Sequence, residues 1–114
     1  MKKLVFIALL GLILSSCGGV KTLYSWYDYE NITYNYSKKQ TDELKAKAIE
    51  AYGKLLNKQR GSRETVPPGL NAEYGYMLYM SGKEEEGLKF LQEEINLYPE
   101  SEIYISRIIK QLKQ

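Results

Sequence analysis

The side chains most suited to catalysis are scarce in this 114-residue sequence, which contains one cysteine, Cys17, and no histidine. A cysteine nucleophile is usually activated by an adjacent base such as histidine. The common zinc sites also lack their cysteine and histidine ligands here. The acidic runs Glu84–Glu86 and Glu93–Glu94 are expected on solvated faces, because consecutive helical residues point in different directions. We therefore expect no enzyme activity, no metal and no cofactor.

The residues before Cys17 predict another use for its thiol. Lys2 and Lys3 precede an uncharged apolar run, Leu4 to Leu14, of the length found in a secretory signal peptide. A membrane-spanning helix needs about 20 apolar residues, so this run is too short to span a bilayer. The tetrapeptide LSSC, residues 14–17, resembles the bacterial lipobox, whose cysteine receives diacylglycerol and becomes the new N-terminus. This resemblance implies a lipoprotein with fatty acyl chains such as palmitate on Cys17.

Lipid on Cys17 would place the protein in the bacterial cell envelope, because two or more acyl chains anchor a protein stably to a membrane. Gly18 and Gly19 follow Cys17, with no acidic residue directly after it. Under the sorting rule of some Gram-negative bacteria, this fits the outer membrane, and we expect the protein to face the periplasm. The choice between inner and outer membrane, and the leaflet, stay open.

Charge and length describe the remainder of the chain. The signal carries two of the 16 basic residues, so 14 basic and 14 acidic residues remain, and a nucleic-acid partner has no support. The remaining length is typical of one domain. We divide the chain into a signal peptide (1–16), a lipidated tether (17–23) and a helical domain (24–114).

Hydrophobic periodicity predicts an all-α fold after the signal peptide. Thr41 is expected to cap the first amphipathic helix and Ser101 the last. The aromatic segment 20–37 fits either a helix or a strand hairpin, and the residues alone do not decide. The glycines and prolines of residues 60–69 predict a connector. The predicted helices cover residues 41–58, 70–81, 83–98 and 102–113.

Two glycines inside the predicted helices need a reason, because glycine costs about 1 kcal/mol relative to alanine in a helix interior. Gly75 and Gly87 would let two antiparallel helices approach closely if they faced each other. Gly82 separates the two helices and Pro99 follows the second. The sequence therefore predicts a tightly packed helical hairpin.

The spacing of this hairpin resembles one tetratricopeptide (TPR) repeat of 34 residues. Asn71 and Glu94 depart from the pattern, which has tryptophan and alanine there, so the repeat is degenerate. The resemblance implies packing roles for Tyr74, Gly75, Leu78, Gly82, Gly87, Leu91 and Pro99. In a TPR another side of the first helix lines a concave groove. That side carries the predicted partner-binding residues Ala72, Tyr76, Tyr79 and Met80, unless neighbouring helices cover them.

Four segments, LYSWYDYENITYNYSK, VPPGLNAEYGYMLYMSG, EEINLYPES and RIIKQLK, together resemble a family of small bacterial lipoproteins classed as a domain of unknown function. The resemblance implies that residues 27–38 are helical. Members are often encoded beside a lipoprotein of the CsgG type, which implies a shared envelope assembly.

These features favour a lipid-anchored adaptor that binds a partner lipoprotein or another envelope protein through its groove. One alternative is a pilotin-like assembly factor for an outer-membrane complex. Another is an envelope enzyme acting on peptidoglycan or glycans, with the aromatic stretch Tyr24 to Tyr36 stacking on sugars. A glutamate buried in a cleft would support this alternative. The partner, the pathway and the oligomeric state stay open.

Overall fold

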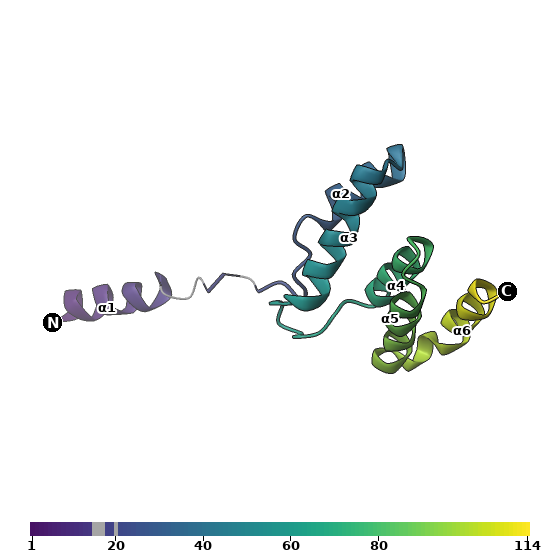
Figure 1. The fold of residues 1–114 in the computed structure, drawn as a ribbon. Helices are drawn as coiled ribbons and strands as arrows, with labels where there is room; N and C mark the ends of the chain where they lie inside the picture. The colour runs from purple at the N-terminus through teal and green to yellow at the C-terminus, as the bar shows by residue number, and fades with distance from the viewer. Residues whose placement is uncertain (15–17, 20) are drawn as a thin grey trace.

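The computed structural model describes residues 1–14, 18–19 and 21–114. Within these residues the fold is all-α, as predicted, and contains no strand (Figure 1). The aromatic segment becomes helical at Tyr29 and does not form a hairpin of strands. The helices are α1 (Lys2–Leu14), α2 (Tyr29–Lys39), α3 (Asp42–Asn57), α4 (Leu70–Met80), α5 (Glu84–Leu97), the short 3-10 helix η1 (Pro99–Ser101) and α6 (Glu102–Leu112).

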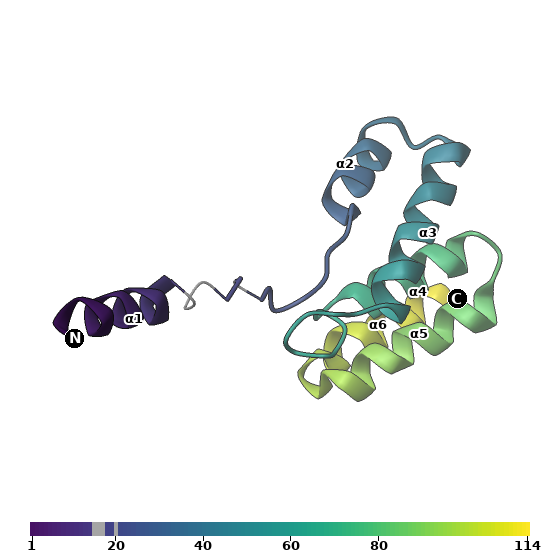
Figure 2. The same ribbon diagram turned by 90° about the vertical axis from the view of Figure 1, so that its left-hand side faces the viewer.

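Helix α1 lies apart from the other helices in both views (Figures 1 and 2). None of the helices in the described part of the chain has the length and apolar character needed to cross a membrane. Cys17, the predicted lipid-attachment residue, lies outside the described residues.

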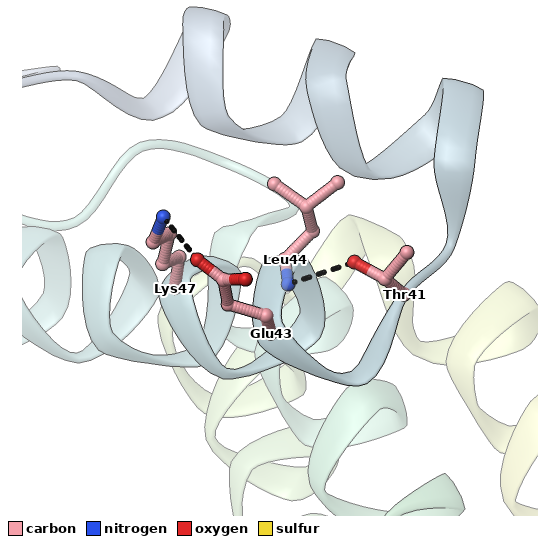
Figure 3. A network of polar contacts seen from close by, with 4 residues as sticks. All are labelled: Thr41, Glu43, Leu44 and Lys47. Carbon is pink, nitrogen blue, oxygen red and sulfur yellow. Dashed lines mark hydrogen bonds and ion pairs between the residues drawn. The ribbon is translucent and has the colours of Figure 1, made fainter.

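Helices α2 and α3 pack side by side and are joined by a two-residue turn (Figure 1). Gln40 has a positive φ of 44°, and its backbone N–H donates to the Tyr36 carbonyl at 2.8 Å. The Thr41 hydroxyl accepts from the Leu44 N–H at 3.3 Å (Figure 3), which confirms the predicted cap. The nearby Glu43–Lys47 pair in Figure 3 is solvent-exposed, so it contributes little to stability.

The first part of the core lies where α2, α3 and the start of α4 meet. Ala48, Tyr52 and Leu55 of α3 are buried together with Leu70 of α4. These α3 residues recur at the three- and four-residue spacing that forms one face of a helix. Tyr29 and Ile32 of α2, among others, pack against this cluster.

The second part of the core is the hairpin of α4 and α5. A Cβ added to Gly75 would lie 2.6 Å from the Gly87 carbonyl oxygen, and one added to Gly87 would lie 2.5 Å from that of Gly75. The two glycines therefore face each other across the closest approach of the helices, as predicted. Leu78 and Leu91 are buried beside them. Gly82, with a φ of 91°, reverses the chain between the helices.

The start of α6 differs from the prediction. Ser101 occupies the N-cap position, but its hydroxyl donates to the Tyr98 carbonyl at 2.7 Å and does not cap α6. The reason is that η1 runs directly into α6, so Ser101 already has helical backbone angles. An N-cap side chain accepts from the first turn only when its own backbone is outside the helix.

The segment before α2 is fixed to the connector between α3 and α4. The backbone N–H groups of Ser62 and Arg63 donate to the carbonyls of Thr22 and Leu23 at 2.9 and 3.1 Å. Gly61 lies so close that an added Cβ would be 2.2 Å from the Leu23 carbonyl oxygen. The folded body therefore begins at about Thr22.

Candidate partner-binding groove

A groove with a volume of about 860 Å³ lies between α4 and α6. Its lining residues come from the end of the connector, from α4, α5, η1 and α6, and most of them are apolar or aromatic. They are Pro68, Gly69, Ala72, Glu73, Tyr76, Glu94, Tyr98, Glu100, Ser101, Tyr104, Ile105, Ile108, Gln111 and Leu112. We call this feature the α4–α6 groove.

The two long walls of the α4–α6 groove are regular helix faces. On α4 the lining residues Ala72, Glu73 and Tyr76 recur at the three- and four-residue spacing of one face. On α6 the same spacing runs from Tyr104 to Leu112. Eight helical rises make this wall about 12 Å long, which matches two turns of a helical ligand.

Tyrosine hydroxyl groups tie the walls of the α4–α6 groove to the rest of the fold. The Tyr79 hydroxyl of α4 donates to the Leu112 carbonyl of α6 at 2.7 Å. The Tyr98 hydroxyl, between α5 and η1, donates to the Val66 carbonyl of the connector. The first contact holds α6 against α4, and the second holds the connector against the junction of α5 and η1.

The structure places two of the four predicted groove residues in the α4–α6 groove and two outside it. Ala72 and Tyr76 line the groove, and Tyr76 is 48% exposed. Tyr79 is partly buried by its contact with Leu112 and is used to hold α6. Met80 is 56% exposed but does not line the groove. Met80 is the last residue of α4, one turn beyond Tyr76, and the groove ends before it.

The opposite wall was not expected from the sequence. The periodic apolar residues of α6 indicated a helix, but nothing in the local pattern showed that Ile108 and Leu112 would face Tyr76 across a groove. Glu94, the residue that departs from the expected TPR-like pattern, lies on α5 and gave no indication of this wall.

Glu94 is almost fully buried, with 2% of its surface exposed, and lines the groove from α5. Its Oε1 accepts a hydrogen bond from the Gly69 N–H at 2.6 Å. Gly69 is the N-cap of α4 and has no side chain to serve as a cap. Glu94 instead satisfies the backbone N–H of the N-cap residue itself, the bond that a glutamate at the third helical position makes in a capping box. A negative charge at this position also interacts favourably with the helix dipole. Its Oε2 is buried and has no hydrogen-bond partner among the described residues.

Glu73 connects the groove to the first part of the core. Its Oε2 accepts hydrogen bonds from the Tyr29 hydroxyl at 2.8 Å and the Tyr52 hydroxyl at 2.6 Å. Burial and the adjacent carboxylate raise the pKa of Tyr29 to about 12 and raise the pKa of Tyr52 further. One carboxylate on α4 thus holds neutral tyrosines from α2 and α3.

A second hollow, of about 500 Å³, lies on α2 and the turn before it and includes the Tyr27 and Tyr34 rings. The Lys54 ammonium lies 4.7 Å from the centre of the Tyr27 ring, and Lys38 lies 4.6 Å from that of Tyr34. One face of each ring is therefore already occupied by a cation. This makes the hollow a weaker candidate for sugar stacking than its aromatic content suggests.

In the described residues, no three acidic, cysteine or histidine side chains gather in a way that would hold a metal ion. The contacts of the α4–α6 groove are hydrogen bonds and apolar surface. Such an arrangement can bind a ligand by shape, by apolar burial and through its carboxylates.

Comparison with known proteins identifies the family. The family described as "Domain of unknown function (DUF4810)" matches residues 23–108, which include α2 to α5 and most of α6. The chain therefore belongs to this family. No curated protein and no solved structure matches the chain.

Proposed function

We propose that this DUF4810 protein is a lipid-anchored adaptor that binds another envelope protein in the α4–α6 groove and catalyses no reaction. The observation that carries the proposal is the groove itself. Tyrosine and aliphatic side chains line a volume of about 860 Å³, and tyrosines bury a large area with little loss of side-chain freedom. Tyrosine is also among the residues that are enriched at protein interfaces.

The proposed anchor supports this function through local concentration. If Cys17 carries lipid, four residues separate it from Thr22, where the folded body begins. The five steps along the chain from Cys17 to Thr22 span at most about 17 Å when fully extended. The groove would then be confined to a thin layer beside the membrane, which raises its effective concentration toward any protein in that layer. We propose the periplasmic face of the outer membrane as this location and a CsgG-type lipoprotein as the partner.

A TPR-like arrangement would explain which helices form the groove. In such repeats the first helix of each hairpin lines the concave side, and α4 and α6 would be two successive first helices. A pilotin-like assembly factor would use the same surface to bind a subunit of an outer-membrane complex. Because such a factor is needed for assembly, deletion of the protein would then deplete the assembled complex.

The buried Glu94 favours one further candidate, an enzyme acting on glycans. Most glycoside hydrolases use two carboxyl groups, one on each side of the scissile bond. Glu94 and Glu73 both line the groove, but Glu94 already accepts from Gly69, and Glu73 accepts from two tyrosine hydroxyls. Both therefore have structural roles, which makes the adaptor the better proposal.

Affinity purification from membranes tests the adaptor. Tagged wild-type protein is expected to retain a defined envelope protein that a Tyr76→Ala, Ile108→Ala variant loses. Gln92→Ala is the matched control, because Gln92 is exposed on α5 and does not line the groove. Equal retention by wild type and the groove variant would contradict the proposal. Hydrolysis of peptidoglycan by wild type but not by Glu94→Gln would support the enzyme instead.

A further inference from the structure

Resting on the proposed function, we propose that the α4–α6 groove binds an amphipathic segment of its partner that carries a lysine or arginine among apolar residues. The basic side chain would be recognised by the Glu94 carboxylate and, at the rim, by Glu100. The segment of the partner that binds the groove is therefore cationic and amphipathic.

The charged residues that line the groove are all acidic. Three charged residues line it, Glu73, Glu94 and Glu100, and no lysine or arginine does. None of the three forms an ion pair within the described part of the chain. Helix α6 does carry cations, Arg107 and Lys110, but both are exposed and neither lines the groove. The groove is therefore locally acidic in a chain whose acidic and basic residues nearly balance.

Glu94 provides a second, independent observation. Buried polar atoms are nearly always hydrogen-bonded, so one without a partner calls for an explanation. Glu94 Oε1 is satisfied by Gly69, whereas Oε2 has no partner in the described residues. A carboxylate oxygen only accepts, and lysine and arginine offer only donors. A basic side chain entering the groove would supply the missing donor.

The apolar residues of the lining indicate that the ligand also has an apolar surface. Ile105, Ile108 and Leu112 form an aliphatic wall on α6, and Ala72 and Tyr76 face it from α4. A fully polar basic peptide would leave this surface without a partner. An apolar segment of about two helical turns would cover it. Glu94 Oε2 is covered by protein atoms in the free chain, so binding requires side-chain rotation at the groove, as is common at interfaces.

Three synthetic amphipathic peptides test the inference on the purified full chain by fluorescence anisotropy. They share one leucine and alanine pattern, and the central polar residue is lysine, glutamine or glutamate. The lysine peptide is expected to bind at least about tenfold more tightly than the glutamine peptide, as for a hydrogen bond between charged groups. The glutamate peptide is expected to bind most weakly.

Two variants assign the preference to Glu94. Glu94→Gln keeps an oxygen acceptor for Gly69 and removes the charge, so it is expected to abolish the preference for lysine. Glu93→Gln is the matched control, because Glu93 is exposed and does not line the groove. Since Glu94→Gln also affects a buried contact, Glu100→Gln at the exposed rim provides a second test, with a smaller loss of preference expected.

Equal affinity for the lysine and glutamine peptides, or a preference unchanged in Glu94→Gln, would overturn the inference. If binding of both peptides then still weakened in Tyr76→Ala, the adaptor proposal would stand without its charge specificity. Binding that is insensitive to both Glu94→Gln and Tyr76→Ala would contradict both proposals.

Discussion

The close approach of α4 and α5 predicts that the same glycine-to-alanine substitution has opposite effects on stability at Gly75 and at Gly53. A Cβ on Gly75 would lie 2.6 Å from the Gly87 carbonyl oxygen and 2.9 Å from the Leu91 backbone nitrogen. A Cβ on Gly53, which lies inside α3, would meet only the Tyr74 hydroxyl, at 3.8 Å. Gly75→Ala therefore forces backbones apart, whereas Gly53→Ala fits.

The magnitudes follow from the two contacts. Ordinary non-bonded contacts are about 3.5 Å or longer, so Gly75→Ala requires α4 and α5 to separate by roughly 1 Å. Overpacking of this kind costs about 1–3 kcal/mol, and helix propensity returns about 1 kcal/mol. Because backbone and not a flexible side chain is in the way, we expect a net loss of about 2 kcal/mol. Gly53→Ala causes no such overpacking, so its higher helix propensity alone should stabilise the fold by up to about 1 kcal/mol.

Urea unfolding followed by far-ultraviolet circular dichroism measures both variants. The unfolding free energies of Gly53→Ala and Gly75→Ala are expected to differ by about 2–3 kcal/mol, with wild type between them. Gly87→Ala should behave like Gly75→Ala, because its Cβ would meet the Gly75 carbonyl oxygen at 2.5 Å. If Gly75→Ala were as stable as Gly53→Ala, the close approach of α4 and α5 would be refuted.

Four further predictions concern other parts of the chain. Tyr52→Phe leaves the fold intact but removes one hydrogen bond to Glu73, so unfolding free energy should fall by about 1–2 kcal/mol in the same assay. Tyr29 has a pKa raised to about 12 from an ordinary value of 10, so its contribution to stability is complete below pH 10 and lost as the pH rises through 12. In a pH titration followed by tyrosinate absorbance, Tyr29 should ionise at a higher pH than an ordinary tyrosine. Glu73→Gln should lower the pH at which it ionises. Thr41→Ala removes the cap of α3 and should cost about 1 kcal/mol, whereas Thr41→Ser should retain most of it. Cys17→Ala should abolish labelling by a fatty-acid analogue in cells, and retained label would remove the lipid anchor from the proposed function.

The helices and the hairpin seam were predictable because their causes are local. Apolar residues at helical spacing indicate a buried face, and glycine in a helix interior is costly enough to suggest close packing. The positions of Gly75 and Gly87 therefore predicted where the two helices of the hairpin approach each other closely. The N-cap role of Thr41 was predictable as well, because a hydroxyl followed by two acidic residues is typical of a helix start.

The groove was only half predictable because its walls come from distant segments. Ala72 and Tyr76 could be placed on one face of α4, but the position of α6 depends on η1 and on the contact between Tyr79 and Leu112. The pairing of Glu94 with Gly69 joins residues 25 positions apart, and no periodicity encodes it. The same is true of Thr22 and Ser62, whose contact attaches the start of the body to the connector.

Photo-crosslinking in intact cells tests the central claim, that the α4–α6 groove is occupied by another envelope protein, most directly. A photoreactive residue replaces Tyr76 in the groove or, as the matched control, Gln92 on the exposed side of α5. We predict one defined product at position 76, absent at position 92 and lost when Ile108→Asp is added. Identical products at both positions, or none at position 76 in cells that express the folded chain, would contradict the account.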